Sequence, residues 1–472
     1  MTTFDRTALA YAVCFASLLL VTGRVNAGGF QITEQCTVCQ GKRNAGSAAS
    51  ADAPGTLYFN PANLSWLDGT QFDLSLHHIA GTFKFSDRGS TNLDGEPLEG
   101  IQRINGAESA TIGSLTLTHQ FSDRWAAGLN VTVPYGLVTN YNSQWVGRYN
   151  ADRSDLAIIS VSPAVSYRLS EKWALAGGVT WQTAKAELTN NIDMAGVLNR
   201  VLADQLPPFL LPEPGNPDRD ALARVKADDD GFGYNLGLMW EPRSGTRLGV
   251  GYRSKIEMTL KGDLTIKASP GLRDFIESLP IDPGLEEIKV NGKADFDTPN
   301  SVWASIYHEI DDRWRLMGSA TWTQWTSFDE IAIEIEDDGE IVQPEGWDNQ
   351  WRFGAGAEFD YNNRLTLRTG LEYDHTPVEP NANTARVPDN DRFWLAFGAT
   401  WIPRSYERLT LDFAYSHVFI NDYTLIEREV FTNQTIHAIT GGDNDDANTL
   451  FGDYEADADI FSVGFRWRFG GD

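Results

Sequence analysis

The stretch Phe461-Ser462-Val463-Gly464-Phe465-Arg466-Trp467-Arg468-Phe469 alternates between large apolar residues and small or charged residues. Successive side chains of a β-strand point to opposite faces, so a period of two predicts a strand with one apolar and one polar face. A strand of about ten residues, tilted by about 45°, is long enough to cross a bilayer. The stretch therefore predicts a transmembrane strand whose apolar face contacts lipid.

The same alternation recurs along the chain from about residue 70 onward, with turn residues between the segments. We count about fourteen segments, an even number that suits a bacterial all-β barrel of antiparallel transmembrane strands. The expected strands are 70–85, 111–121, 124–138, 155–169, 172–187, 231–242, 245–261, 294–310, 313–326, 349–361, 364–376, 391–403, 406–419 and 459–469.

The connections between these segments alternate in length. Short turns such as Ser122-Asp123 alternate with long loops such as 188–230. Short periplasmic turns and long extracellular loops are typical of outer-membrane barrels. Three tryptophans follow short turns almost at once, as an aromatic girdle at the periplasmic interface requires: Trp125, Trp173 and Trp314. A soluble β-sandwich or propeller explains neither feature.

Bulk composition excludes two other classes. The mean hydropathy is −0.32, and beyond the N-terminus no run of about 18 apolar residues could form a membrane-spanning helix. The net charge of −27 and the pI near 4.6 argue against nucleic acid as a partner. Much of the acid falls in expected loops such as 443–459, where it would solvate exposed segments.

The N-terminus has the form of a secretory signal. Arg6 precedes an apolar run over 8–21, and Val25-Asn26-Ala27 has the small-x-small form of a signal-peptidase site. We expect residues 1–27 to be removed, so that Gly28 begins the mature chain. The alternative, an N-terminal anchor helix, has an apolar run too short to span a bilayer comfortably. Export and barrel together predict the outer membrane of a Gram-negative cell.

Residues 28–69 do not follow the strand pattern and precede the barrel, which we expect over 70–472. The segment is rich in small residues and ends near Asn60-Pro61-Ala62. We expect it to fold into the lumen as a plug, with a flexible periplasmic tail as the alternative. Its Cys36 and Cys39 are separated by two residues, and an exported pair of this kind forms a disulfide by default. Gln40 stands where a covalent haem site needs His, and no βαβ pattern supports a redox motif.

Several motifs in order resemble the FadL-type outer-membrane transporters of fatty acids and aromatic hydrocarbons (OMPP1/FadL/TodX). The similar motifs are Ala27-Gly28-Gly29-Phe30-Gln31, Asn60-Pro61-Ala62, Val133-Pro134-Tyr135-Gly136-Leu137, Trp145-Val146-Gly147-Arg148-Tyr149, Gly251-Tyr252-Arg253-Ser254, Tyr373-Asp374-His375-Thr376-Pro377 and Arg386-Val387-Pro388-Asp389-Asn390-Asp391-Arg392. The resemblance covers nearly the whole mature chain. It implies a fourteen-stranded barrel closed by an N-terminal plug, and lateral release of ligand through a gap in the wall without an energy source. The Cys36–Cys39 pair departs from the general family pattern.

Two expected extracellular loops carry apolar residues at helical spacing, which predicts amphipathic helices. Apolar stripes in loops that face water need a reason. We interpret them as a capture groove for an acyl chain, and the alternative is that the two helices pack on each other. The candidate ligand-binding residues are Met194, Val197, Leu198, Val201, Leu202, Phe209 and Leu210 in one loop, and Leu272, Phe275, Ile276 and Leu279 in the other.

A fatty acid also carries a carboxylate, and burying it without a cation is costly. Strand parity places Leu248, Val250 and Tyr252 toward lipid, so Arg253 and Lys255 are expected to face the lumen and to bind the carboxylate. The same parity predicts five further inward arginines: Arg352, Arg368, Arg392, Arg466 and Arg468. The alternative role for such arginines is pairing with lumen acids such as Glu358 and Glu372.

No catalytic signature is present in the sequence, which lacks Gly-x-Ser-x-Gly and His-Glu-x-x-His. We therefore expect a transporter without enzymatic activity, cofactor or metal site; a barrel lipase and a general porin are the rival classes. The expected partners are hydrophobic small molecules, outer-membrane lipid and lipopolysaccharide, and we expect a monomer. A long-chain fatty acid is favoured over an aromatic hydrocarbon or alkane, which the apolar loops would also suit.

Overall fold

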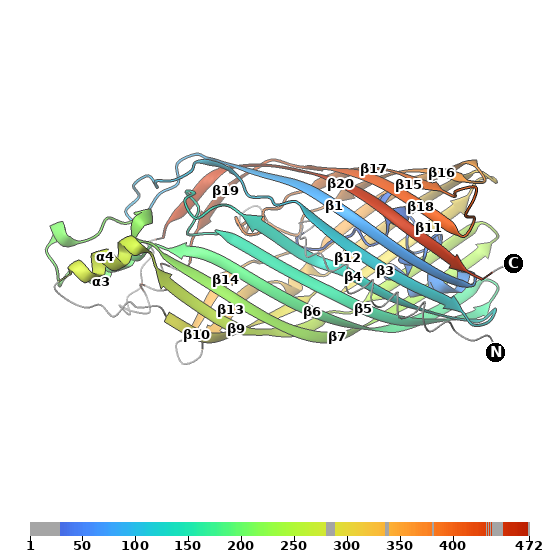
Figure 1. Ribbon diagram of the computed structural model, residues 1–472, viewed down its shortest axis with the longest axis horizontal. Helices are drawn as coiled ribbons and strands as arrows, with labels where there is room; N and C mark the ends of the chain where they lie inside the picture. The colour runs from blue at the N-terminus through green and yellow to red at the C-terminus, as the bar shows by residue number, and fades with distance from the viewer. Residues whose placement is uncertain are drawn as a thin grey trace.

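The computed structural model describes residues 29–279, 288–335, 339–379, 382–430, 432, 434, 436 and 447–470. The predicted signal segment 1–27 lies outside these ranges. Fourteen strands form a closed antiparallel barrel, as the sequence predicts. Figure 1 shows the barrel from the side, with the end of the last strand at one end and two loop helices at the other. No helix in the described ranges is long and apolar enough to cross a membrane.

Most wall strands are continuous. They are β1 (Thr70–Asp87), β3 (Ala110–Gln120), β4 (Trp125–Asn140), β5 (Arg153–Ser170), β6 (Trp173–Ile192), β7 (Ala221–Arg243), β15 (Gln350–Asn362), β16 (Leu365–Asp374), β17 (Arg392–Trp401), β18 (Leu409–Ile420) and β20 (Thr449–Phe469). The other wall strands are interrupted along their length: β8 (Thr246–Arg253) with β9 (Ile256–Ala268), β10 (Ile288–Thr298) with β11 (Ser301–Glu309), and β12 (Trp314–Thr323) with β13 (Glu330–Ile335).

The remaining elements lie inside the barrel or at its extracellular end. Short strands β2 (Arg103–Asn105), β14 (Gly339–Pro344) and β19 (Tyr423–Arg428) extend the sheet. The N-terminal segment contains α2 (Thr37–Gln40) and the 3₁₀ turns η1 (Pro54–Tyr58) and η2 (Pro61–Trp66). The loops contain α3 (Met194–Val201), η3 (Pro208–Leu210), η4 (Pro217–Arg219), α4 (Pro270–Ser278) and η5 (Trp325–Ser327).

Alternate side chains of the wall strands face lipid and lumen, as the period of two predicts. On β20, Phe461 and Val463 are 54% and 51% exposed, whereas Ser462 between them is 3% exposed. The tryptophans after the short turns pair with aromatic residues of neighbouring strands; Trp173 stacks on Trp240, for example, with ring centroids 5.2 Å apart. These rings form the expected aromatic girdle at the end of the barrel that carries the short turns.

Two strands begin ten residues earlier than the sequence pattern predicts. β7 begins at Ala221 rather than near 231, and β20 begins at Thr449 rather than near 459. The first residues of β7 continue the hydrogen-bonded ladders to β6 and β9. Their outward side chains are charged, as at Arg224 and Lys226, because this part of the wall stands above the bilayer. The apolar alternation that marks a membrane strand is therefore absent there, although the backbone pairing is not.

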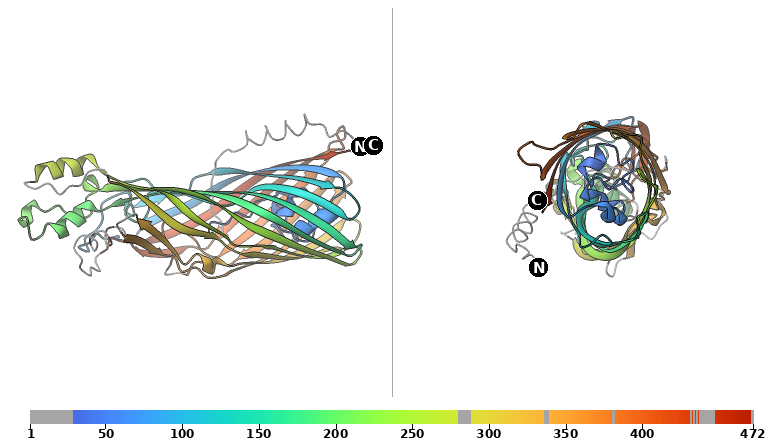
Figure 2. Two further views of the ribbon diagram at one scale, coloured as in Figure 1. Left: turned by 90° about the horizontal axis from the view of Figure 1, so that it is seen from below. Right: turned by 90° about the vertical axis from the view of Figure 1, so that its right-hand side faces the viewer.

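The N-terminal segment lies inside the barrel, as the end-on view in Figure 2 shows. Its backbone approaches the wall closely at glycines. A Cβ atom at Gly251 would lie 1.8 Å from the carbonyl oxygen of Phe59, and one at Gly249 would lie 1.8 Å from that of Ala48. Cys36 and Cys39 form the predicted disulfide within this segment. The segment is therefore packed into the lumen rather than attached loosely.

The close approach at Gly251 predicts that Gly251→Val will unseat the N-terminal segment, because the valine side chain would overlap the backbone at Phe59. Overpacking of this kind costs about 1–3 kcal/mol or more. We expect a lower unfolding temperature of the purified barrel and increased ion conductance in planar bilayers. Gly177→Val is the matched control, because a Cβ there meets no atom closer than 3.7 Å. Equal behaviour of both variants would contradict the packing argument.

Candidate functional site

The two loop helices, α3 and α4, contribute to one apolar cluster at the extracellular end of the barrel (Figure 1). Nine of the eleven predicted apolar loop residues belong to it or pack against it: Met194, Val197, Leu198, Val201, Leu202, Leu272, Phe275, Ile276 and Leu279. Most of the α3 members are nearly fully buried. The two helices therefore contribute to one apolar cluster together with strand residues such as Ile192 and Leu264.

Phe209 and Leu210 lie outside this cluster. They are 83% and 39% exposed in η3, because the prolines before them turn the chain away from α3. Their predicted role in ligand binding has no support from packing with the other residues.

A largely apolar cavity lies in the lumen below the helices. It contains an empty volume of about 940 Å³, part of which is open to solvent. Leu264 belongs both to the helix cluster and to the cavity wall, so the two are contiguous. Residues from several wall strands supply most of the apolar lining, including Leu137, Leu156, Leu188, Leu260 and Phe296. An apolar lining of this kind suits part of a hydrophobic ligand.

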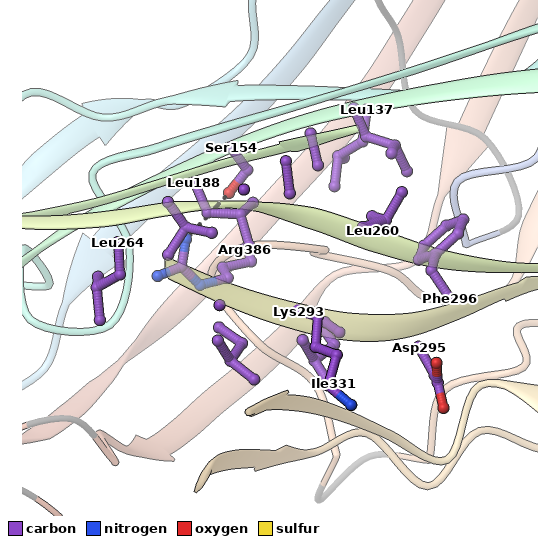
Figure 3. A pocket seen from close by; sticks show the side chains of 18 of the residues that line it. Leu137, Ser154, Leu188, Leu260, Leu264, Lys293, Asp295, Phe296, Ile331 and Arg386 are labelled. Atoms are coloured by element: carbon purple, nitrogen blue, oxygen red, sulfur yellow. Dashed lines mark hydrogen bonds between the residues drawn. The ribbon is translucent and has the colours of Figure 1, made fainter. Parts of the chain in front are cut away.

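Arg386 places a positive charge on the cavity wall. It follows β16 in a loop that enters the lumen and is 8% exposed. Its guanidinium donates to Asn190 Oδ1 at 2.9 Å and to Ser154 Oγ at 3.4 Å. Within the described part of the chain, no carboxylate forms an ion pair with it. Figure 3 shows Arg386 next to Ser154 and Leu188, with Leu260 and Phe296 further along the cavity.

Glu345 adds a buried acid to the same cavity. It lies in the loop after β14, outside the membrane-spanning strands, and is 1% exposed. Among the residues that the structure describes, none offers either carboxylate oxygen a hydrogen bond of good geometry. Burial, together with the nearby Glu427, raises the pKa of Glu345 to about 8, although Trp347 and Arg386 act in the opposite direction. The carboxyl group is therefore largely neutral at pH 7.

Phe30 forms the floor of the cavity and is surrounded by aromatic rings. Its ring centroid lies 4.7 Å from that of Trp325, 5.1 Å from that of Phe328 and 5.6 Å from that of Trp347. Edge-to-face contacts of this kind favour a defined position of the ring. The start of the N-terminal segment is thus held against the cavity by packing.

The wall of the barrel has a gap beside Phe30. β3 pairs with β1 from Ala110 to His119 but with β4 only from Leu115 onward. β4 has a register shift between Thr132 and Tyr135, where Pro134 lacks the N–H that a ladder bond would use. Backbone bonds from Ile32 N to Pro134 O (2.8 Å) and from Gly136 N to Phe30 O (2.9 Å) join the N-terminal segment to this bend.

The structure separates the two cations predicted to bind the carboxylate. Arg253 faces the lumen but contacts the N-terminal segment, donating to the Tyr58 carbonyl at 3.1 Å and stacking over the Tyr58 ring. Lys255 points to the outer face and pairs with Glu257 and Asp297 at 2.7 and 2.9 Å. The predicted inward orientation of Lys255 is therefore wrong. Both Arg253 and Ile256 face inward, so the break between β8 and β9 resets the alternation.

The other predicted lumen arginines have structural partners. Arg368 pairs with Glu358 at 2.5 Å, Arg466 pairs with Asp412 at 2.6 Å, and Arg392 pairs with Asp389. Arg352 donates to Gln31 of the N-terminal segment at 2.8 Å. Arg468 is exposed at the periplasmic end. Arg352, Arg368, Arg392 and Arg466 therefore hold the interior together rather than face the cavity.

A family model described as outer membrane protein transport protein (OMPP1/FadL/TodX) matches residues 18–469. The chain belongs to this family. It is therefore an outer-membrane protein of a Gram-negative bacterium. The resemblance drawn from the sequence motifs is confirmed.

Relatives within the OMPP1/FadL/TodX family transport hydrophobic molecules. The long-chain fatty acid transport protein of Escherichia coli O6:H1 is 26% identical over 420 residues, which cover 88% of this chain and 92% of the relative. A Pseudomonas aeruginosa FadL homologue has the same fold, with a TM-score of 0.82, 24% identity and coverage of 94% and 100%. The Pseudomonas putida toluene transporter TodX superimposes with a TM-score of 0.65, 18% identity and coverage of 89% and 95%.

The structure gives physical reasons for two motifs that resemble those of the OMPP1/FadL/TodX family. Asn60 caps η2 by accepting from Ala62 N at 2.9 Å, and its amide donates to the Leu238 carbonyl of β7 at 3.0 Å. Arg148 is fully buried among the extracellular loops and pairs with Asp220 at 2.8 Å. The first motif anchors the N-terminal segment to the wall, and the second holds the loops together.

The outward position of Lys255 predicts that Lys255→Ala will leave oleate affinity unchanged within about twofold, because exposed ion pairs contribute little. Arg253→Met should instead weaken the packing of the N-terminal segment and affect charged and neutral ligands alike. Both affinities can be measured by fluorescence competition on purified protein. A loss confined to oleate in Lys255→Ala would contradict the assignment.

Proposed function

We propose that the protein is a passive transporter of long-chain fatty acids. The acyl chain would first contact the apolar cluster of α3 and α4, then enter the cavity below it. Transfer of each methylene from water to an apolar site contributes about 0.8 kcal/mol. Uptake of this kind requires binding and diffusion only, so no catalytic step is proposed.

The observation that carries the proposal is Arg386, a buried cation on an apolar cavity wall. A carboxylate at the end of an acyl chain would complete its charge balance by a charge-assisted hydrogen bond. A neutral hydrocarbon would leave the guanidinium without an anionic partner. Aromatic hydrocarbon or alkane uptake remains the second candidate, because most of the cavity lining is apolar and would accept either ligand.

The ligand would leave the cavity at the place where the cavity meets the gap between β3 and β4. Phe30 lines the cavity and shares backbone hydrogen bonds with the bend in β4. A ligand that displaces Phe30 would therefore disturb the segment that covers the gap between β3 and β4. Lateral movement through this gap would deliver the ligand toward the bilayer rather than through the packed lumen.

The charge on Arg386 predicts that Arg386→Gln will weaken oleate binding about tenfold or more, since a hydrogen bond to a charged group contributes about 1.5–3 kcal/mol. Binding of oleyl alcohol, which has the same chain without the carboxylate, should change little. Arg88→Gln is the matched control, because Arg88 is exposed and pairs with Asp453 outside the cavity. Equal losses for both ligands would remove Arg386 from a carboxylate site, and tighter binding of the alcohol to the unmodified protein would favour hydrocarbon uptake.

Glu345 predicts a pH dependence. Its carboxyl group is neutral below pH about 8 and can donate to a ligand carboxylate. When it ionises above that pH, it repels the ligand and competes for Arg386. We therefore expect the affinity for oleate to fall as the pH rises through about 8, measured against oleyl alcohol to correct for effects on the barrel. The side chain of Glu345→Gln stays neutral, so this variant should lose the pH dependence of oleate affinity. If Glu345→Gln keeps that dependence, another group titrates.

A further inference from the structure

The lysines of this chain are concentrated on one outer face. Of ten lysines, six project from the outer face of the neighbouring strands β6, β7, β9 and β10, near the extracellular end: Lys185, Lys226, Lys261, Lys267, Lys289 and Lys293. All six are exposed. Lys255, in the break between β8 and β9, lies on the same side. We call the six strand residues, without Lys255, the lysine face. Figure 1 shows the four strands that carry it side by side.

The lysine face lies above the apolar belt. On β6 the belt ends at the exposed Trp181, and on β7 it ends at the exposed Phe232. Lys185 follows Trp181 by four positions, and Lys226 precedes Phe232 by six. With a rise of about 3.3 Å per residue and a tilt of about 45°, these lysines stand roughly 9–14 Å above the aromatic rings. A molecule that contacts them can therefore also insert apolar chains beside the belt.

Three of the six lysines take part in no ion pair with any residue that the structure describes. In the ranges that the structure covers, Lys185, Lys261 and Lys267 form no ion pair. Lys261 lies directly opposite Lys293 in the β9–β10 register, and like charges at opposite positions are unfavourable unless an anion lies between them. Lys293 pairs with Glu334 at 2.6 Å, but both side chains are more than half exposed, so this pair is weak and exchangeable.

Carboxylates alternate with the lysines on this face. Asp228, for example, lies opposite Lys261 in the β7–β9 register, so the face carries little net charge. A soluble polyanion would therefore gain little by binding there. The pattern instead suits an amphiphile that is held in the membrane by its acyl chains and needs only local cations for its phosphates.

We propose that the lysine face binds lipopolysaccharide of the outer leaflet. Lys261 and Lys293 would share a phosphate of its lipid A or inner core, Lys185 would contact a second anionic group, and the acyl chains would lie on the apolar belt below. The strands that carry this surface also line the cavity and extend to α3 and α4. Bound lipopolysaccharide would therefore cover the wall beside the cavity, which Lys293 also lines.

The test compares two forms of lipid A that share their acyl chains but carry two phosphates or one. Binding to purified full-length protein in detergent can be measured by native mass spectrometry and by competition with a fluorescent lipid A. We expect the bisphosphorylated form to bind more tightly, with an affinity that falls as salt concentration rises. The triple variant Lys185→Ser, Lys261→Ser and Lys293→Ser should bind it about a hundredfold more weakly and lose the preference.

Two controls separate this surface from general charge and from folding. Lys84→Ser with Lys172→Ser removes lysines of β1 and of a periplasmic turn, and should leave lipid A binding unchanged. The triple variant should keep the heat-dependent gel migration of a folded barrel. Equal binding of the two lipid A forms, or equal loss in both sets of variants, would overturn the proposal. If the unmodified protein did not bind oleate, fatty acid uptake would be refuted, but the proposed lipopolysaccharide site would not be affected.

Discussion

The structure depends on one constraint: a backbone that crosses hydrocarbon must satisfy its polar groups without water. The chain meets it by pairing its first and last wall strands along their full length, from Thr70 opposite Phe469 to Asp87 opposite Gly452. Closure leaves no free edge within the bilayer, and alternating side chains then separate lipid from lumen. The lumen of a fourteen-stranded barrel is wide enough to need filling, and the N-terminal segment fills it.

The filling is held by buried charge as well as by packing. Arg43 of the N-terminal segment pairs with Glu34 at 2.9 Å and with Glu372 of β16 at 3.0 Å, and its guanidinium lies 3.4 Å from the centre of the Trp394 ring. Removing one partner of a buried pair costs about 3–5 kcal/mol, because the other charge is left uncompensated. The lower lumen is therefore filled by a segment that is held in place, whereas the cavity above it is lined largely by residues such as leucine and phenylalanine.

The sequence predicts those parts of the molecule in which lipid imposes an alternation on the side chains. The strands within the bilayer, the tryptophan girdle and the disulfide follow from such local patterns. The extensions of β7 and β20 were missed because water imposes no apolar alternation there. The orientation of Lys255 was predicted wrongly, because the break between β8 and β9 reverses the inward and outward alternation of side chains. No local sequence pattern indicates that break. Arg386 and Glu345 lie in loops that only the fold brings to the cavity; Arg386 opens a recognised motif, but its position as a cavity cation could not be inferred from it.

The gap between β3 and β4 obeys the same constraint as the closed part of the wall: backbone polar groups in the membrane need hydrogen-bond partners. A missing ladder would leave backbone groups of β4 without partners, which is costly in a membrane. The N-terminal segment supplies those partners: Ile32 N donates to Pro134 O, Phe30 O accepts from Gly136 N, and the Gln35 amide donates to Val133 O at 3.0 Å. On the other side, Ser114 Oγ donates to Gln35 O at 2.9 Å. The segment thus takes the place of a neighbouring strand across the gap. Because Phe30 is also the floor of the cavity, the wall opening and the ligand cavity share one short piece of chain, and neither can change without the other.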